Sequence, residues 1–394
     1  MRETMTDKRR QILDAALALC AEDGLQGAAT ARIAKAAGVA NGTLFHHFPS
    51  KEVLIQSLYQ DIKLRLGAAI TEADAALPLA RHFAALTTNI AAARDFGITT
   101  TFGNVSVQQA SANALYLTRL AGYRRPIAQG VQFPQLKTPG KHPDFVHGND
   151  GLGNLHGRSE VGGQIEAESA AEFIVKMARQ FPGEISLVGV GPMGNLALAL
   201  KLEPRLPRLL KQVVVMAGTI DEPGNVSPVA EANVWNDPHA ADQIFTAGCD
   251  LTMVGLDVTH RVVLKTELFE RLAQQHQHPA MDSLLHAVLF YASFYDSFRS
   301  GLERGFYAHD VLAFVWLVAP ELFSTRMGRI RVATEGIGNG QTMMAETHTS
   351  FQQPGWEQSR PETRACMEVD AISCEKLIGT TLTRPWLHKP LTNV

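Results

Sequence analysis

Hydrophobic and polar residues follow two different patterns along this chain, and the pattern changes near residue 95. Up to residue 94, apolar residues recur three and four positions apart, which predicts a series of amphipathic helices. Beyond it, short β-branched runs are each followed by glycine and then by a helical stretch. Strands that alternate with helices predict an α/β fold with a mostly parallel sheet and crossover helices. The four clearest strands begin at Gly97, Ile185, Gln212 and Leu251.

Within the first segment, two short helices are predicted over 31–37 and 41–47, behind a longer first helix. Further helices are expected from residue 51 onward and over 79–93. Two short helices joined by a glycine turn are typical of a helix-turn-helix. Polar residues should cap these helices and glycines should end them: the caps are Thr30 and Asn41, and the stops are Gly24 and Gly38.

Composition and charge narrow the class of protein. The length of 394 residues suggests two domains, and 45% hydrophobic with 19% charged residues excludes a disordered chain, a collagen-like repeat and a coiled coil. The formal net charge of −3 gives no global basic field, so any DNA contact must come from a local patch. The four cysteines are far apart without a CxxC pair, which favours a reducing cytoplasm over a disulfide framework or zinc site. No apolar run approaches the roughly 18 residues of a membrane span, so no membrane partner is expected.

Three stretches of the first segment, at 9–16, 31–39 and 41–54, resemble the TetR family of transcriptional repressors. The resemblance implies that the helix over 41–47 enters the DNA major groove, where the small residues Gly42 and Thr43 allow close approach. Residues 1–70 hold nine lysines and arginines against seven acidic residues, so the segment is weakly basic. A small helical bundle without a DNA role remains the alternative. The residues expected to contact DNA are Thr30, Arg32, Asn41, Gly42, Thr43, His46, His47 and Lys51.

From residue 96 nearly to the C-terminus, a series of short motifs resembles the inosine–uridine nucleoside hydrolases, which cleave the N-glycosidic bond of ribonucleosides. The motifs lie at 97–106, 147–153, 191–197, 216–218, 224–238, 256–259, 308–313 and 330–336. Each is weak alone, but their order along the chain is specific. The two resemblances together predict a helix-turn-helix domain over 1–94 and a nucleoside hydrolase-like α/β domain over 95–394.

Asn225, Glu231 and Asn233 are the best candidates for holding a sugar. Breaking a ribosyl–base bond builds positive charge on the sugar, which amide and carboxylate oxygens can stabilise. The three residues lie in a loop broken by glycine and proline, so their side chains can converge on one sugar. The resemblance implies that they bind the ribose hydroxyls. The alternative is that the two asparagines only satisfy loop backbone groups.

The remaining candidate site residues follow from the resemblance. His309 matches a histidine near the leaving base and is a plausible proton donor there. A His-Asp pair is otherwise more often a helix cap, and His147 could equally be a surface loop histidine. Asp237 and Asp257 look structural, the former as a cap before Pro238. By resemblance, the calcium ligands are Asp310 and the carbonyl of Val190, the catalytic residues are His309 and Asp310, and the further substrate-binding residues are Asn104, His147 and Met216.

One motif of the hydrolase family is missing. The family opens with a strand and the sequence Asp-x-Asp-Pro-Gly-x-Asp-Asp, which supplies most calcium ligands and the base that activates water, and this chain has no such run. Calcium takes about 6–8 oxygen ligands, so Asp310 with one carbonyl makes a poor site. Losing a general base costs about 10²–10⁴ in rate. The missing strand should also leave a slot in the sheet.

The sequence therefore predicts a cytoplasmic ribonucleoside hydrolase-like protein, fused to a TetR-type segment, with impaired activity. Its expected cofactor is calcium and its expected partners are a ribonucleoside, double-stranded DNA and a second copy of the chain. The alternatives are a nucleoside-responsive transcriptional regulator with a non-catalytic pocket, and the product of a rearranged gene that performs neither role well.

Overall fold

The chain divides into two compact units, Met1–Ala76 and Leu77–Val394. The computed structural model describes residues 5–27, 29–51, 53–55, 57–58, 96–122, 125–156, 163–298, 302 and 304–383. The predicted join near residue 95 and the predicted helix over 79–93 lie outside these residues, as does most of the helix predicted from Lys51. The domain boundary thus stays a prediction.

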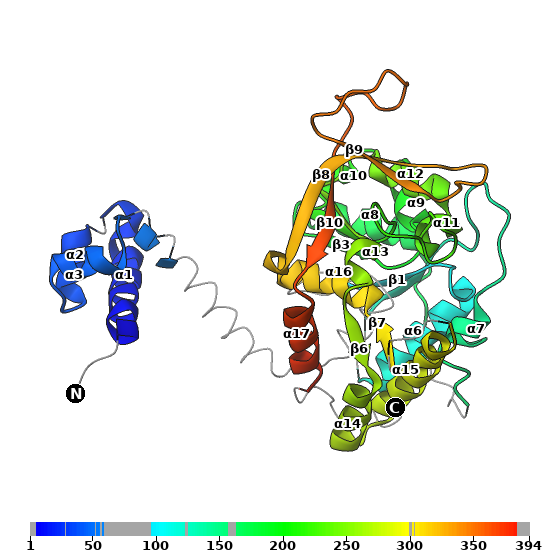
Figure 1. Cartoon of the computed structure of the whole chain (residues 1–394), viewed down its shortest axis with the longest axis horizontal. Helices are drawn as coiled ribbons and strands as arrows, with labels where there is room; N and C mark the ends of the chain where they lie inside the picture. The colour runs from blue at the N-terminus through cyan, green and yellow to red at the C-terminus, as the bar shows by residue number, and fades with distance from the viewer. Residues whose placement is uncertain are drawn as a thin grey trace. The chain divides into compact units, whose positions relative to one another are not determined.

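The first unit contains three described helices, α1 (Met5–Gly27), α2 (Thr30–Ala36) and α3 (Asn41–His47) (Figure 1). Their apolar faces meet in one small core, in which Ile12, Ile33, Leu44 and Phe48 are almost fully buried. Between α2 and α3, Gly38 has φ of +65°, a conformation that side chains with a Cβ rarely adopt. The helix-turn-helix predicted from spacing is therefore present.

The predicted caps of this unit are wrong by one residue. Ala29 and Ala40 have extended backbones and are the N-cap residues, and neither makes a side-chain cap. The Ala29 carbonyl already accepts hydrogen bonds from Arg32 and Ile33, so Thr30 is the first helical residue rather than the cap. Helix α1 also continues past Gly24, because glycine lowers helix stability without forcing an end.

The second unit is built on a six-stranded sheet with the order β3-β4-β5-β10-β8-β9. The first four strands are parallel. Strand β8 runs antiparallel to β10, and β9 runs antiparallel to β8. The α/β fold and all four predicted strands are thus confirmed. The strands are β1 (Ile98–Thr100), β2 (Ile127–Gln129), β3 (Ser186–Gly189), β4 (Gln212–Met216), β5 (Leu251–Val254), β6 (Val263–Lys265), β7 (Gly305–Tyr307), β8 (Phe323–Val332), β9 (Thr342–Glu346) and β10 (Thr363–Val369).

Helices cover both faces of this sheet, and β4 shows how its sequence permits this. Val213 and Val215 pack into one apolar cluster, with residues of α8, α9 and α12, while Val214 and Met216 pack into a second cluster with α14 to α17. A strand that is apolar on both faces is typical of a buried parallel sheet. The helices are α6 (Val107–Leu120), α7 (Asp144–His147), α8 (Ala170–Gln180), α9 (Gly194–Leu202), α10 (Leu206–Leu209), α11 (Ala232–Asn236), α12 (Pro238–Phe245), α13 (Leu256–Thr259), α14 (Thr266–His276), α15 (Pro279–Phe298), α16 (His309–Val318), the 3₁₀ helix η2 (Pro320–Leu322) and α17 (Ala371–Thr383).

Strands β1 and β2 form a parallel pair of their own, outside the six-stranded sheet. Among the described residues, no strand pairs with β3 on the side away from β4. The side chain of Asn195, near the start of α9, contacts the last residue of β1 and the segment that follows β2. Its Nδ2 donates to the Thr100 carbonyl at 2.9 Å, and its Oδ1 accepts from the Val131 amide at 2.9 Å. Among the described residues, the six-stranded sheet therefore ends at β3, with β1 and β2 as a separate pair. That the chain lacks the family's first strand stays a prediction.

Residues 126–164 are rich in glycine, proline, histidine and asparagine, a composition that predicts one long functional loop, and this prediction is partly wrong. Strand β2 and the short helix α7 lie within it. Both are shorter than a typical strand or helix, so periodicity could not reveal them. The remaining part, 130–143, is an irregular loop that leads from β2 to α7.

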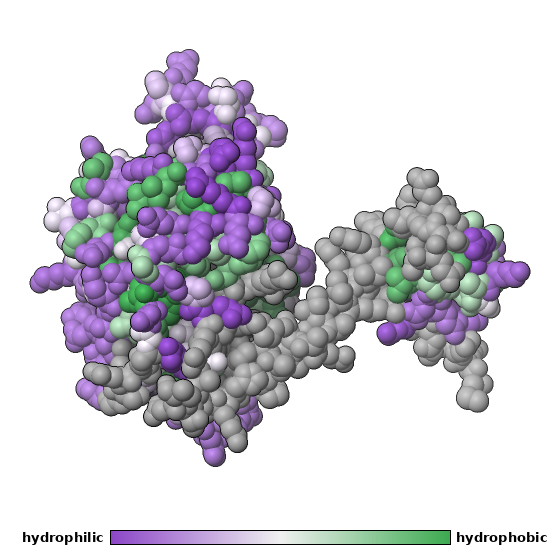
Figure 2. Space-filling model, turned by 180° about the vertical axis from the view of Figure 1, so that it is seen from behind, coloured by the Kyte–Doolittle hydropathy of each residue, from purple (hydrophilic) through white to green (hydrophobic). Residues whose placement is uncertain are grey.

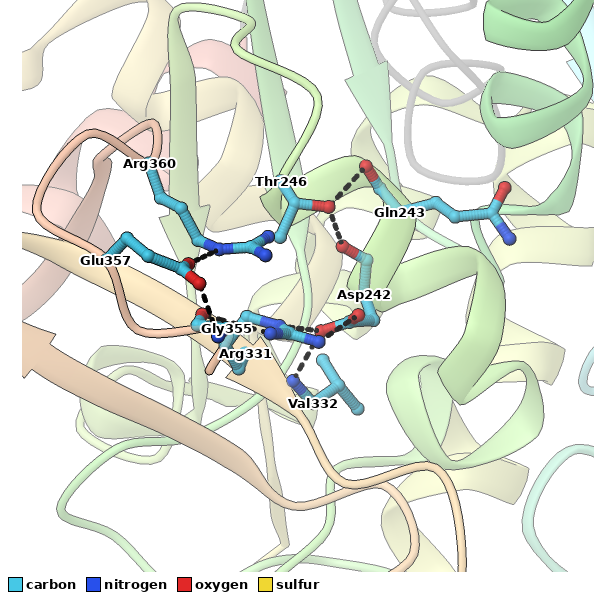
Figure 3. A network of polar contacts seen from close by, with 8 residues as sticks. All are labelled: Asp242, Gln243, Thr246, Arg331, Val332, Gly355, Glu357 and Arg360. Atoms are coloured by element: carbon cyan, nitrogen blue, oxygen red, sulfur yellow. Dashed lines mark hydrogen bonds and ion pairs between the residues drawn. The ribbon is translucent and has the colours of Figure 1, made fainter. Parts of the chain in front are cut away.

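A polar network ties β8 to α12 and to the loop after β9 (Figure 3). Arg331 Nε and Nη2 donate to the Asp242 carboxylate, at 2.8 and 3.0 Å. Arg331 Nη1 donates to the Gly355 carbonyl at 3.0 Å. The Gly355 amide in turn donates to Glu357, which also accepts from Arg360. These bonds fix α12, and α11 immediately before it, against the sheet.

The outer surface of the second unit carries mainly polar residues on the side shown in Figure 2, with strips of hydrophobic residues between them. The loop between β9 and β10, which projects in Figure 1, is largely hydrophilic. None of the helices that the structure describes is long and apolar enough to cross a membrane.

Candidate functional site

Two of the predicted site residues of the second unit lie at the carboxyl ends of neighbouring parallel strands. Met216 is the last residue of β4, and Val190 directly follows β3 at the neighbouring position in the register. Ligands of open α/β sheets bind at this edge, because loops from several strands meet there.

Glu231 is the most deeply buried of the three residues predicted to hold a sugar. It is only 2% exposed and caps the N-terminus of α11. Its Oε1 accepts from the Asn233 amide at 2.8 Å, and its Oε2 accepts from the amides of Gly218 at 2.9 Å and Val234 at 3.1 Å. Burial raises the pKa of Glu231 to about 7, while these three hydrogen bonds act in the opposite direction.

The two asparagines flank Glu231. Asn233 Nδ2 donates to the Met216 carbonyl at 2.9 Å and approaches the Met216 sulfur at 3.6 Å. Asn225 Oδ1 accepts from the Ala232 amide at 2.9 Å. The structure thus brings Met216, Asn225, Glu231 and Asn233 together, and each amide side chain still has further donor or acceptor capacity.

His309 and Asp310 are the first two residues of α16. The N-cap is Ala308, and neither residue makes a side-chain cap, so the reading of this pair as a helix cap is wrong. His309 Nδ1 lies 2.8 Å from the Thr259 hydroxyl, and its Nε2 lies 3.2 Å from the Tyr295 hydroxyl. Burial and the charge of Glu231 raise the pKa of Asp310 to about 8, so these two carboxyl groups interact electrostatically.

An aromatic series connects His309 to His147. The Tyr295 hydroxyl bonds the Tyr291 hydroxyl at 3.0 Å, and the Tyr291 ring stacks on His147 with 5.1 Å between centroids. Burial, with smaller contributions from Tyr295 and Asp310, raises the pKa of Tyr291. Burial also lowers the pKa of His147 to about 4, so this histidine is neutral at pH 7. His147 therefore belongs to a series of contacts that leads through Tyr291 and Tyr295 to His309.

The described residues do not fit the calcium site that the resemblance implies. They contain no group of three or more histidine, cysteine or acidic side chains that could hold a metal. Asp310 has a raised pKa and would contribute a single carboxylate, whereas calcium takes about 6–8 oxygen ligands. No step of the chemistry is therefore assigned to calcium.

Other predicted residues have simpler positions. Asn104 is exposed after β1, and no contact among the described residues joins it to the other predicted site residues. Val190 packs against the apolar cluster that includes Met216. Asp237 caps α12 through the Ala240 amide, and Asp257 accepts from three consecutive amides, from Ile220 to Glu222, so both are structural as predicted.

Three residues that contact His309 directly or through this series were not predicted from the sequence: Thr259, Tyr291 and Tyr295. Thr259 ends one of the quoted motifs. The tyrosines are four positions apart on α15, a spacing that puts both on one helix face. That aromatic pair was the available signal.

In the first unit, the predicted DNA-contacting residues surround α3. Arg32, Asn41, Gly42 and His46 are exposed, whereas Thr30, Thr43, His47 and Lys51 are partly buried. The buried face of α3 is occupied by Leu44, so the opposite face is open to a partner.

Comparison with known proteins agrees with this geometry. The family model described as inosine-uridine preferring nucleoside hydrolase matches residues 82–376. The chain belongs to this nucleoside hydrolase family. A second model, for bacterial regulatory proteins of the tetR family, matches residues 12–58. Both resemblances noted in the sequence are thereby confirmed.

Individual members of the nucleoside hydrolase family are clearly similar to this chain. A probable uridine nucleosidase 2 of Arabidopsis thaliana is 37% identical over 285 residues, covering 72% of this chain and 87% of the relative. The non-specific ribonucleoside hydrolase RihC of Escherichia coli is 32% identical, covering 72% and 88%. The solved structure of the plant nucleoside hydrolase PpNRh1 superposes with a TM-score of 0.70 at 31% identity and covers 78% of this chain and 96% of its own.

Proposed function

We propose that the second unit binds a ribonucleoside in a recess lined by these candidate residues, and that it hydrolyses the N-glycosyl bond slowly. The observation that carries the proposal is the bonded set of Glu231, Asn233 and Met216, together with the electrostatic interaction of Glu231 with Asp310 and the hydrogen bond from Tyr295 to the neighbouring His309. Uridine nucleosidases and ribonucleoside hydrolases among the relatives support the same substrate class.

The residues divide the work between the two ends of the nucleoside. Asn225, Glu231 and Asn233 would hold the ribose hydroxyls and stabilise the positive charge that grows on the sugar as the bond breaks. His309 would give a proton to the leaving base, with Thr259 and Tyr295 orienting its ring. Tyr291 and His147 would line the base end of the recess.

Slow turnover follows from what the sequence lacks. No Asp-rich run supplies a base for the attacking water, and the described donors do not make a calcium site. Loss of the base alone costs about 10²–10⁴ in rate. Binding of the sugar should survive, because the residues that would hold it are positioned by bonds within the chain.

The test compares binding with turnover for uridine and inosine, with and without added calcium. We expect calorimetric binding by the wild type, a turnover at least about 100-fold below that of an intact family member, and further loss in His309→Ala. Asn233→Ala should weaken binding, whereas Asn236→Ala on the same helix serves as the matched control. Turnover equal to an intact member would contradict the impairment, and absence of binding would contradict the pocket.

A second candidate function is nucleoside-responsive DNA binding. It is favoured by the folded helix-turn-helix and the exposed outer face of α3. One half-site contact is weak, so this candidate also requires a homo-oligomer, which light scattering can measure. Binding to a palindromic DNA library is then titrated with salt, with and without uridine. Retention that ignores sequence and vanishes at moderate salt would contradict specific readout.

A further inference from the structure

The loop over 130–143 connects β2 to α7 and contacts α11 and α12. It begins at the end of β2 and ends at α7, whose last residue is His147. Between these points it lies against α11 and α12. The Gln135 amide donates to Asp237 Oδ2 at 3.2 Å, and Gln243 Nε2 donates to Gln135 Oε1 at 2.7 Å.

The strongest of these contacts joins Lys137 to Trp235. The Lys137 ammonium donates to the Trp235 carbonyl at 2.7 Å and lies 2.9 Å from the centroid of the same residue's ring. A charged donor makes a stronger hydrogen bond than a neutral one, and a cation over an indole adds further attraction. The bonded carbonyl lies near the C-terminal end of α11, where a positive charge is favourable.

Trp235 is well placed to transmit this contact. It lies on α11, two residues after Asn233 and four after Glu231. A methyl group at Gly140 would lie 3.6 Å from the Trp235 ring, and one at Gly340 would lie 2.8 Å from its Cα. The tryptophan is thus enclosed by the loop on one side and by the β8–β9 connection on the other.

We infer that Lys137 is a positioning residue that latches the loop over 130–143 onto α11, and so holds His147 and Asn233 at a fixed separation across the bound ribonucleoside. The inference rests on the proposed function and extends it, since it assigns a residue that touches neither sugar nor base. Preorganisation of this kind improves binding because less order is lost when the ligand arrives.

The charge of Lys137 is maintained at neutral pH. Burial lowers the pKa of Lys137 to about 8, and the carboxylate of Asp237 opposes that change. Lys201 and His239 also interact electrostatically with Asp237. The ammonium form therefore predominates at pH 7, and the charge-dependent contacts with Trp235 are formed there.

The experiment compares three variants of the full chain. Lys137→Met removes the charge and donor, Lys137→Arg keeps both, and Lys141→Met removes the same charge from an exposed position of the same loop. We expect Lys137→Met to weaken uridine and inosine binding about tenfold, Lys137→Arg to restore most of it, and Lys141→Met to match the wild type. Thermal melts monitored by circular dichroism show whether each variant folds.

A spectroscopic readout separates the latch from the substrate. The contribution of Trp235 to the fluorescence is the difference between a chain and the same chain carrying Trp235→Phe. This difference, measured in each background, should change in Lys137→Met but not in Lys141→Met. Normal nucleoside binding by a folded Lys137→Met chain would overturn the latch and leave the proposed function intact, as would an unchanged Trp235 signal. A wild type that binds neither nucleoside would overturn the proposed function, and the latch with it.

Discussion

The two carboxyl groups of the proposed recess, those of Glu231 and Asp310, have different surroundings. Glu231 is almost fully buried and accepts three backbone hydrogen bonds at the start of α11. Asp310 is partly exposed, and no group among the described residues donates a hydrogen bond to its carboxylate. Burial raises the pKa of both, but only Glu231 has donors that act against the rise.

The difference separates the part of the site that the chain completes from the part that it does not. On the Glu231 side, every contact needed to place Asn233 and Met216 is made within one unit. On the Asp310 side, burial and the charge of Glu231 favour the protonated carboxyl group, since they raise its pKa to about 8. Sugar binding and catalytic turnover should therefore respond differently to substitution.

The largest expected effect is that of Glu231→Ala. The substitution leaves the amides of Gly218, Asn233 and Val234 without their acceptor in a buried position, and about 3 kcal/mol of folding free energy should be lost. Urea denaturation measures the loss, and nucleoside binding should disappear with it. Glu184→Ala, at an exposed position, is the control. Equal stability of the two variants would show that Glu231 does not organise α11.

Asp310→Asn should have a smaller effect of the opposite sign. A carboxyl group whose pKa is raised to about 8 binds a proton in the folded state that the unfolded state releases above about pH 4, so folding stability falls as pH rises towards 8. The amide removes this dependence. After allowance for the partial exposure of the side chain, we expect Asp310→Asn to gain about 2 kcal/mol at pH 8 and almost nothing at pH 4.

The measurement is urea denaturation at the two pH values, with exposed Asp282→Asn as the control. A gain at pH 8 would confirm that Asp310 is a carboxylate without compensation in this chain. A loss at pH 8 would mean that a cation or donor stabilises it, and would remove the contrast with Glu231.

The sequence predicted the elements with strong periodicity and the site residues within ordered motifs. The valine run of β4 and the apolar face of α3 could be predicted locally. The spacing of apolar residues indicates burial of both faces for β4 and of one face for α3. Strand β2 and helix α7 were missed because three or four residues carry no period. Their existence depends on pairing with β1 and on packing against α15, which are contacts distant in sequence.

The same limit applies to the site. Asn225, Glu231 and Asn233 lie within nine residues of one another, so their convergence could be inferred from the chain. The series from His309 through Tyr295 to His147 joins three segments far apart in sequence, and only the fold brings them together. Lys137 gave no signal, because a lone lysine in a loop is ordinarily a solvated surface residue.

His147→Phe should have the smallest effect and refines the comparison at the base end of the recess. The pKa of His147 is lowered to about 4 by burial, so between pH 4 and about 6.5 the unfolded state binds a proton that the folded state does not. Stability is therefore lost as pH falls through this range. Phenylalanine preserves a ring for the stack on Tyr291 but cannot be protonated. We expect His147→Phe to gain about 1 kcal/mol relative to wild type between pH 7 and pH 5, while His348→Phe, on the exposed loop after β9, gains nothing. An equal response of both variants would place His147 in water and detach it from the recess.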